Sequence, residues 1–266
     1  MTGDTPGMAE PALRLRGVGV SFRGVRALDD VSFDVPAGGV TAVIGPNGAG
    51  KTTLFNCIGG IYRHEGDIEL YGDSVRQLRP PQRANAGIAR TFQTPTLLDH
   101  SSVWDNVMLG ASAWARSGVA GGAFASRRAR TEESETRAAA WEAIVAAGVE
   151  GLAHRPAGAL AHADRRRVEV ARALVSRPRL LMLDEPAAGL SESEADELLA
   201  LVAEYAGTTG MTCVLVEHDV ALVMRTSRWI AVLDAGRLLA TGTPAEIQKN
   251  PAVVAAYLGT DVEVRA

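Results

Sequence analysis

The sequence predicts an α/β fold that combines a parallel sheet with an antiparallel β region and a helical region. Short segments that are apolar throughout alternate with helical patterns, which is typical of a parallel sheet covered on both faces. β-rich segments separated by turns fill the first part of the chain, and helical periods replace them in the middle. These three observations indicate one core with an inserted helical region.

The composition is that of a folded globular protein. The chain has 266 residues, a formal net charge of -4 at pH 7 and a hydrophobic share of 47%. Disordered chains, collagen-like chains and disulfide-stabilised scaffolds are therefore excluded. Only Cys57 and Cys213 are present, without the spacing of a metal site, so we expect two reduced, buried thiols in a cytosolic protein.

Three functional classes are disfavoured by what the sequence lacks. No stretch reaches the roughly 18 apolar residues of a membrane-spanning helix, since residues 107–126, the nearest, contain Arg116. Residues 1–17 have no apolar core of a secretory signal, so we do not expect export. The mildly acidic charge balance gives no basic footprint, so we expect no nucleic-acid partner.

The expected strands fall into two groups. β-rich segments divided by Gly and Pro turns predict an antiparallel sheet over residues 13–21, 31–35 and 67–71. Apolar runs that lead into helical patterns predict the parallel sheet over residues 40–44, 180–183, 212–216 and 229–233.

The helical region is expected to be an insertion into this core. Ala-rich helical periods take over after residue 94, and acidic residues open the helix expected over 131–147. Two short helices are expected near the C-terminus, the second entered through Asn250-Pro251. We predict a flexible N-terminus over 1–12, a single domain over 13–260 with its core in 13–93 and 178–243, a helical subdomain over 94–177, C-terminal helices over 244–258 and a tail over 259–266.

A glycine-rich loop after the strand expected at 40–44 predicts a nucleotide site. It reads Gly45-Pro46-Asn47-Gly48-Ala49-Gly50-Lys51-Thr52-Thr53 and leads into a helical segment, the context that the G-x-x-x-x-G-K-[ST] motif requires. Glycines let successive N–H groups face phosphate oxygens, and the helix N-terminus adds partial positive charge. Lys51 would contact the β and γ phosphates of ATP, and the Thr52 hydroxyl would bind Mg²⁺. Of the 27 Lys and Arg residues only Lys51 and Lys249 are lysine, so a lysine in this loop is notable.

Two further strands end in residues that suit phosphate chemistry. Asp184 and Glu185 follow an apolar strand, where Asp184 can hold Mg²⁺ and Glu185 can act as general base. His218 follows another strand that ends at the same sheet edge and can reach a γ phosphate. An acidic pair after a strand is common by itself, but together with the phosphate loop it predicts a Walker B element. The other histidines are expected to be structural: His64, His100, His154 and His162.

From about Leu13 to Leu258, these elements in this order resemble the ATP-binding subunits of ABC transporters. The resemblance implies a P-loop NTPase core with an antiparallel β subdomain and a helical subdomain, and ATP and Mg²⁺ as cofactors. It places Phe22 at the adenine-stacking position and residues 188–191 at the D-loop. Gln93, in Ala89-Arg90-Thr91-Phe92-Gln93, falls at the Q-loop, which senses the γ phosphate, belongs to the metal site and touches the membrane partner. His218 is then the switch histidine.

Two stretches narrow the resemblance to the ATPases of branched-chain amino acid uptake systems. They are residues 89–93 and the C-terminal Gly242-Thr243-Pro244-Ala245-Glu246-Ile247 with Asn250-Pro251 and residues 256–259. Importers of urea, amides and other amino acids share this pattern. The resemblance implies membrane permease subunits, a second ATPase subunit and, indirectly, a substrate-binding protein as partners. It also implies a peripheral location on the cytoplasmic face of the plasma membrane.

One segment departs from the family pattern. The signature loop, in this branch close to Leu-Ala-Tyr-Gly-Asp, aligns with Leu160-Ala161-His162-Ala163-Asp164, so Ala163 replaces a glycine. In the family this loop binds the γ phosphate of ATP held by the opposite subunit. The Cβ of Ala163 either blocks that approach, requires a positive φ at a cost of about 1 kcal/mol, or is tolerated. A defect would fall on the partner's site in a heterodimer and on both sites in a homodimer.

Three functions therefore stay open at this point. The first is a peripheral ATPase that hydrolyses MgATP to drive a permease. The second is a nucleotide-dependent clamp with weak hydrolysis, which Ala163 favours and the presence of Glu185 opposes. The third is an ABC ATPase that acts on DNA or ribosomes, which the single P-loop and the absence of a long heptad run oppose.

Overall fold

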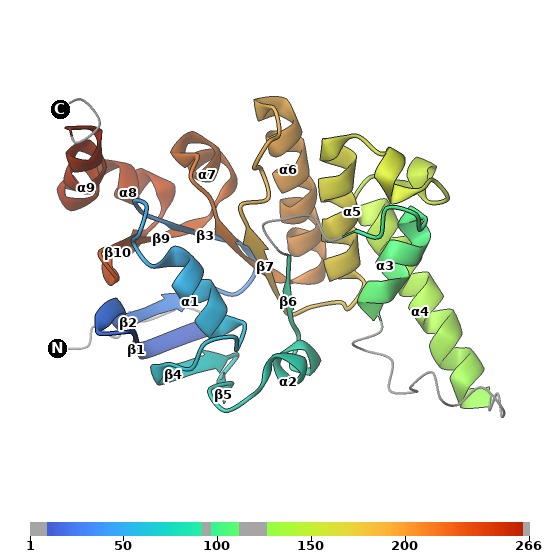
Figure 1. Cartoon of the computed structure of the whole chain (residues 1–266), viewed down its shortest axis with the longest axis horizontal. Helices are drawn as coiled ribbons and strands as arrows, with labels where there is room; N and C mark the ends of the chain where they lie inside the picture. Colours follow the sequence, from blue (N-terminus) through green and yellow to red (C-terminus); the bar gives the residue numbers. More distant parts are fainter. Residues whose placement is uncertain (1–9, 92–96, 112–126, 263–266) are drawn as a thin grey trace. The chain divides into compact units, whose positions relative to one another are not determined.

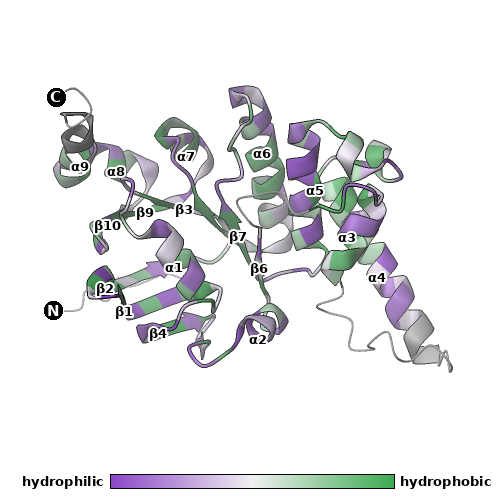
Figure 2. Cartoon of the chain, in the orientation of Figure 1, coloured by the Kyte–Doolittle hydropathy of each residue, from purple (hydrophilic) through white to green (hydrophobic). Residues whose placement is uncertain are grey.

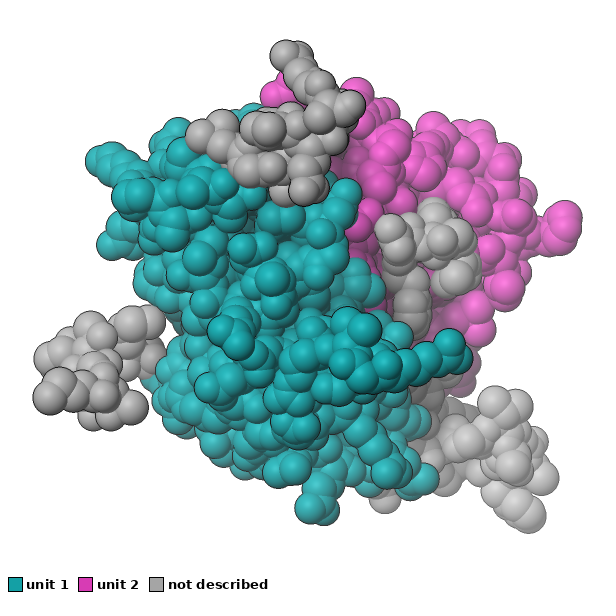
Figure 3. Space-filling view, turned by 60° about the vertical axis from the view of Figure 1, so that its left-hand side comes forward, with its two compact units in different colours: residues 1–83, 206–266 teal, residues 84–205 magenta. Residues whose placement is uncertain are grey.

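The computed structural model describes residues 10–91, 97–111 and 127–262. The chain divides into two compact units, one formed by residues 1–83 and 206–266 and the other by residues 84–205 (Figure 3). The predicted N-terminal segment 1–12 lies largely outside the described residues. Each unit has its own packing, which positions different parts of the expected site.

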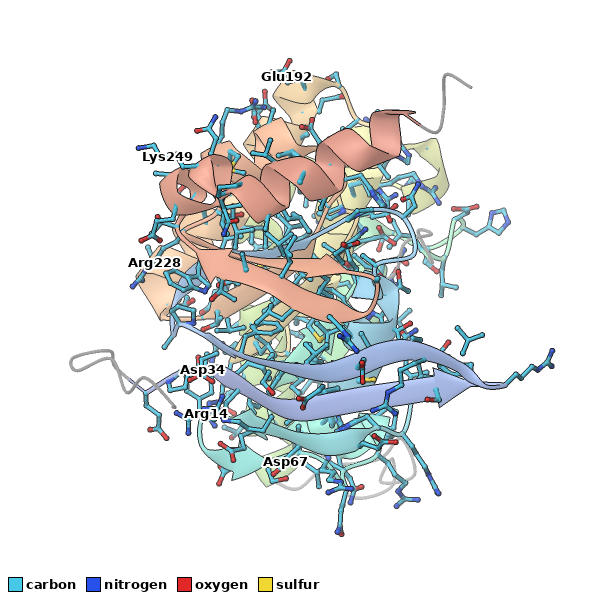
Figure 4. The ribbon with its side chains drawn as sticks, turned by 90° about the vertical axis from the view of Figure 1, so that its left-hand side faces the viewer. Arg14, Asp34, Asp67, Glu192, Arg228 and Lys249 are labelled. Carbon is cyan, nitrogen blue, oxygen red and sulfur yellow. The ribbon has the colours of Figure 1, made fainter. Side chains whose placement is uncertain are left out.

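An antiparallel sheet forms the N-terminal part of the first unit, as the sequence predicts. It contains β1 (Leu13–Phe22), β2 (Val25–Val35), β4 (Glu65–Leu70) and β5 (Asp73–Ser74), in the order β2-β1-β4-β5. Apolar residues alternate along β1 and β2 and are buried on one face, which fixes the register of the pair. On the other face Arg14 and Asp34 lie on neighbouring strands with 3.4 Å between the guanidinium and the carboxylate (Figure 4).

A second set of strands in the same unit is mainly parallel. It contains β3 (Gly39–Ile44), β8 (Thr212–Val216), β9 (Trp229–Asp234) and β10 (Arg237–Gly242). β3 pairs in parallel with β8 and β9, and β10 pairs antiparallel with β9. The helices of this unit are α1 (Lys51–Ile58), α2 (Pro80–Asn85, which crosses into the second unit), α7 (Val220–Thr226), α8 (Pro244–Lys249) and α9 (Pro251–Val262) (Figure 1).

The C-terminal helices of this unit cover the parallel strands with apolar side chains. One buried cluster joins Ile44 of β3 and Ile230 of β9 to Val223 of α7, Ile247 of α8 and Val253 of α9. Thr243 and Glu246 form a capping box at the start of α8, with Pro244 at the first helical position. The C-terminal segment is therefore built into the core that carries β3.

A buried arginine closes the end of α1. Arg83 is only 2% exposed, and its guanidinium donates to the carbonyl oxygens of Cys57 at 2.5 Å and Ile58 at 2.6 Å. The carbonyls of the last helical turn lack intrahelical donors. The Cys57 carbonyl also accepts from the Gly60 N–H at 3.1 Å, whereas the Ile58 carbonyl depends on Arg83. Nε of Arg83 also donates to the Leu78 carbonyl at 3.0 Å. The guanidinium therefore links α1 to the segment before α2.

The second unit combines two strands with a helical group. β6 (Ile88–Arg90) pairs in parallel with β7 (Leu180–Asp184), and β7 is buried along its length and mainly hydrophobic (Figure 2). The helices are α3 (Val103–Ala111), α4 (Arg127–Ala146), α5 (His162–Leu174) and α6 (Glu192–Thr209, which ends in the first unit), with short 3-10 helices at Glu150–Leu152 and Ala157–Ala159. α3 and α5 touch at Gly110, where a Cβ would lie 2.0 Å from the Arg172 carbonyl oxygen. Only glycine permits that approach.

Most predicted elements are confirmed with shifts in their ends, the largest at β2, which begins at Val25 rather than at residue 31. The strand over 212–216 has the predicted bounds, and the expected helix 131–147 is α4, four residues longer at its start. β5, β6, β10 and α2 were not predicted from the sequence. α9 continues to Val262, so the tail predicted to begin at 259 starts inside a helix.

Two global expectations can be compared with the described residues. Cys57 and Cys213 are both buried and free, as predicted, and burial raises the pKa of Cys57 to about 12. Within the described residues, no helix has both the length and the apolar character needed to cross a bilayer.

Replacing Arg83 by Met is expected to lower the free energy of unfolding by about 2–4 kcal/mol, because the buried Ile58 carbonyl loses its donor and the Cys57 carbonyl loses one of two. The measurement is urea unfolding followed by circular dichroism. Arg79→Met is the control, since Arg79 is exposed, and it should stay within about 0.5 kcal/mol of the wild type. Equal stability of both variants would contradict a structural role for Arg83.

Candidate functional site: a phosphate-binding loop

The predicted glycine-rich loop connects β3 to α1, and two of its glycines are required by the packing. At Gly45, with φ 154°, a Cβ would lie 2.1 Å from the Leu233 carbonyl oxygen. At Gly50, with φ 100°, it would lie 2.9 Å from the Ala27 carbonyl oxygen. The first and last glycines of the motif are therefore fixed by neighbouring backbone.

Gly48 has a different reason to be glycine. Its φ is 80°, but a Cβ built there would meet nothing within 4 Å. Gly48 lines a cavity of about 280 Å³. A side chain at this position would therefore stand in open space beside the cavity rather than in the protein core.

The cavity has the chemistry of an anion site. Lys51, Thr52, Thr53 and the loop residues from Asn47 to Gly50 line it together with Ala27 and His218, and no carboxylate is among these lining residues. Lys51 is 6% exposed, and its ammonium group donates to the carbonyl oxygens of Gly45 at 2.6 Å and Pro46 at 3.0 Å. The N-terminus of α1 adds partial positive charge. These donors fit the phosphate groups of a nucleotide.

The structure brings His218 to this cavity, as the sequence predicts. His218 follows β8 and is exposed, and β8 pairs in parallel with β3, so both strands end at the same edge. The next residue, Asp219, caps α7 by accepting from the Leu222 N–H at 3.0 Å. The start of α7 therefore fixes the backbone beside His218.

Phe22 lies at the end of β1 and does not line the cavity. Its ring is 42% exposed and packs edge-on against Tyr62, with ring centroids 5.1 Å apart and an interplanar angle of 70°. An exposed aromatic face beside a second ring suits stacking on a base. Its assignment as the adenine contact stays a prediction.

Tyr257 of α9 is a contact of the loop that the sequence did not indicate. Its side chain packs against the apolar cluster of β3, β9 and α8, and it makes a hydrogen bond with the backbone of Gly45. Burial raises the pKa of Tyr257 to about 12, and the hydrogen bond from Gly45 opposes that rise. The last helix is thereby linked to the first glycine of the phosphate loop.

The predicted acidic pair lies in the second unit. Asp184 is the last residue of β7, and its carboxylate makes a buried ion pair at 2.8 Å with Arg90 at the end of β6. Glu185 follows with φ 50°, a left-handed conformation that is uncommon for a residue with a side chain. This backbone turns sharply after the strand, which is where strain at functional sites is often found.

The signature loop stands at the start of α5 in the same unit. Leu160 and Ala161 are extended, and His162, Ala163 and Asp164 form the first helical turn. Ala163 is helical and has no positive φ, so of the three alternatives for this residue the one that requires a positive φ is wrong. His162 lies within 3.1 Å of the Ala188 carbonyl oxygen, which connects the signature and D-loop segments.

The predicted site residues belong to two different units of the chain. Gln93 lies outside the described residues. The residues of the phosphate loop and His218 belong to the first unit, and Asp184, Glu185 and residues 160–164 belong to the second.

Family models and relatives agree on what the chain is similar to. Residues 28–188 match the ABC transporter model, and residues 237–263 match that of the branched-chain amino acid ATP-binding cassette transporter. The high-affinity branched-chain amino acid transport ATP-binding protein BraF of Pseudomonas aeruginosa is 39% identical over 253 residues, which cover 95% of this chain and 99% of BraF. LivG of Escherichia coli K12 is 40% identical over 255 residues, with the same coverage of 95% and 99%.

Solved structures give the same result. The ADP conformation of MJ1267, an ATP-binding cassette of an ABC transporter, superposes with a TM-score of 0.81 and 29% identity, covering 94% of this chain and 100% of that one. A nucleotide-free cassette from an ABC transporter gives a TM-score of 0.79 and 29% identity, covering 93% and 98%. The predicted P-loop α/β fold is confirmed.

Replacing Gly48 by Ala is expected to weaken ATP binding at least tenfold, because the added methyl stands in the space beside the cavity. Stability should fall by only about 1 kcal/mol, the cost of a positive φ with a Cβ. Titration with a fluorescent ATP analogue measures the affinity. The matched control is Gly210→Ala, which has φ 74° and equally open space, and it should change stability alone. Unchanged affinity in Gly48→Ala would argue against phosphates beside this glycine.

Replacing Tyr257 by Phe keeps the packed ring and removes the hydrogen bond with Gly45. We expect ATP affinity to fall about two- to tenfold, the value of one hydrogen bond. Equilibrium binding to the same analogue is the measurement. Tyr71→Phe loses a comparable bond to the Thr212 hydroxyl, 3.1 Å long, and should not affect affinity. If both variants bind ATP alike, the α9 contact does not support the loop.

Proposed function

Because the chain belongs to the ABC transporter family of ATP-binding subunits, we propose that it uses MgATP hydrolysis to drive import of branched-chain or related amino acids. The family membership makes it a nucleotide-binding ATPase subunit. The alternative of a clamp with weak hydrolysis has no support among the relatives. The observation that carries the proposal is the β3-loop-α1 cavity with the buried Lys51, joined to a C-terminal segment that matches the branched-chain model.

The proposed substrate and partners rest on the relatives. BraF and LivG are named as branched-chain amino acid transport ATP-binding proteins. Their similarity to this chain extends over nearly the whole length of each protein. We infer membrane permease subunits and a second ATPase subunit, identical or different, as direct partners. A substrate-binding protein would act indirectly. The chain would then sit peripherally on the cytoplasmic face of the plasma membrane.

The phosphate loop binds and orients in this proposal. The ammonium group of Lys51 and the N–H groups at the start of α1 would hold the β and γ phosphates. Phe22 would stack on the adenine, and His218, at the cavity, would stabilise charge that develops on the γ phosphate.

The residues of the second unit would supply the acid-base chemistry. Mg²⁺, held by Thr52, Asp184 and Gln93, would neutralise phosphate charge when bound. Glu185 would orient the attacking water and accept its proton. The left-handed turn at Glu185 supports this role, because it directs the residue away from the line of β7.

Residues 160–164 would complete the nucleotide site of the second subunit. The start of α5 offers unsatisfied N–H groups, and Asp164 in its first turn complements the helix dipole. Because Ala163 already has a helical conformation, its side chain adds no backbone strain. The contact between His162 and Ala188 supports a signature loop held by the D-loop.

Replacing Glu185 by Gln is expected to reduce steady-state phosphate release at least 100-fold while ATP binding is retained, since only the carboxylate is lost. The same variant should fail to restore leucine uptake in cells that lack the chain, where the wild type restores it. Glu150→Gln, an exposed glutamate of the same unit, is the control and should behave as wild type in both assays. Full turnover in Glu185→Gln would show that Glu185 takes no part in the mechanism. If the wild type restored uptake of glutamate but not of leucine, the proposed substrate would be rejected.

Replacing Ala163 by Gly is expected to change turnover less than twofold. Stability should fall by about 0.5–1 kcal/mol, because glycine weakens a helical position. Phosphate release and thermal unfolding are the two measurements. A rise in turnover of fivefold or more would show instead that the Ala163 side chain obstructs the site it forms with the second subunit.

A further inference from the structure

A second cavity of the first unit takes no part in the phosphate loop. Its volume is about 380 Å³, within the range of small-molecule pockets of roughly 300–1,000 Å³. One wall is the turn between α1 and β4, which carries Arg63 and His64. The other wall is the segment from β5 to α2, which carries Arg76, Arg79 and Arg83.

The cavity is strongly positive. Four guanidinium groups line it, and no carboxylate is among the lining residues. Arg83 is committed to backbone carbonyls and supports the wall. Arg63, Arg76 and Arg79 are exposed, and their side chains make no hydrogen bond or ion pair with the described residues.

Other arginines of the same unit are used differently. Arg14 pairs with Asp34, Arg26 with Glu65 and Arg237 with Asp29. Each of these three guanidinium groups is compensated by a carboxylate. Arg63, Arg76 and Arg79 of the second cavity have no such carboxylate partner among the described residues. Like charges that line one cavity without a counter-ion repel one another.

His64 adds a buried polar atom to this wall. Its Nδ1 donates to the Glu65 carbonyl oxygen at 2.9 Å. Its Nε2 is buried and has no hydrogen-bond partner among the described residues. His64 lines the cavity, and buried polar atoms are normally satisfied, so Nε2 needs a partner that the described residues do not supply.

We propose that this cavity binds a phosphate-bearing anion, held by Arg63, Arg76 and Arg79 and by Nε2 of His64. Guanidinium groups bind phosphate oxygens with two parallel hydrogen bonds each, and one phosphate group offers enough oxygens for several of them. A single carboxylate would satisfy fewer donors. The shared chemistry fits a small organic phosphate or the headgroup of an anionic lipid.

The test is calorimetric titration of inorganic pyrophosphate into the full-length chain, with its phosphate loop first filled by one equivalent of ADP in magnesium-free buffer. We expect one further site, and the double variant Arg76→Gln and Arg79→Gln should weaken it at least tenfold. Arg228→Gln is the control, because Arg228 is exposed and stands at the edge of β9, away from Asp67 on β4 beside His64 (Figure 4). Binding that the double variant leaves unchanged would overturn the proposal, as would equally tight binding of succinate.

Sedimentation with vesicles distinguishes the two sources of phosphate. Binding to phosphatidylglycerol but not phosphatidylcholine vesicles, lost in the double variant, supports the site and identifies a lipid headgroup. Binding of pyrophosphate without vesicle binding supports the site and identifies a soluble phosphate. Binding of neither probe overturns the proposal. Circular dichroism of the double variant verifies that it is folded.

The pH dependence tests the part played by His64. Burial, Arg83 and Arg76 lower the pKa of His64, whereas the backbone of Glu65 and the carboxylate of Asp67 raise it; Arg63 and Arg79 complete the charged surroundings. A bound anion favours the protonated ring, so binding takes up a proton and affinity rises as pH falls. Sulfate is the probe, because its charge is constant in this range. A rise that His64→Gln abolishes is expected, and a rise that survives in His64→Gln would exclude His64 from the site.

Discussion

The phosphate loop depends on contacts between backbones that only glycine allows. Gly45 approaches the carbonyl of Leu233 at the end of β9, and Gly50 approaches the carbonyl of Ala27 on β2. The N–H of Gly236 also donates to the Ala49 carbonyl at 3.1 Å. The loop is therefore held between the antiparallel sheet and the turn from β9 to β10, and its shape follows from strands that are distant in the sequence. Preorganisation of this kind lets donors meet phosphates without a reorganisation cost at the time of binding.

Arginine side chains have two different roles in this chain: some are held by partners inside the protein, and others present their charge at the surface. Arg83 is buried because backbone carbonyls satisfy its guanidinium, and Arg90 is half-buried where Asp184 compensates its charge. Both arrangements are structural, since a buried charge without a partner is strongly destabilising. The side chains of Arg76 and Arg79 contact neither a carbonyl nor a carboxylate of the described residues, so solvent or an external anion must solvate their charge.

Local patterns explain what the sequence could predict and what it could not. The strands that become β7 and β8 were predictable because they are apolar throughout, and the glycine-rich loop because its residues are contiguous. β6 has three residues and β10 mixes Arg with Gly, so neither carries a periodic signal. The link from Tyr257 to Gly45 and the buried state of Arg83 depend on tertiary neighbours that no window of sequence contains. The same reason applies to His64, which appears structural until the arginines from another segment are placed around it.

The pairing of Arg90 with Asp184 has a consequence for the proposed reaction. A carboxylate at the end of a buried strand cannot stand alone in a low-dielectric environment, and the guanidinium at 2.8 Å compensates it. A metal ion bound by the same carboxylate would therefore either share Asp184 with the guanidinium of Arg90 or displace that guanidinium. Arg90 ends β6 and lies three residues before Gln93, the position that the family resemblance assigns to γ-phosphate sensing. The ion pair therefore joins the end of β7 to the end of the strand that precedes this position.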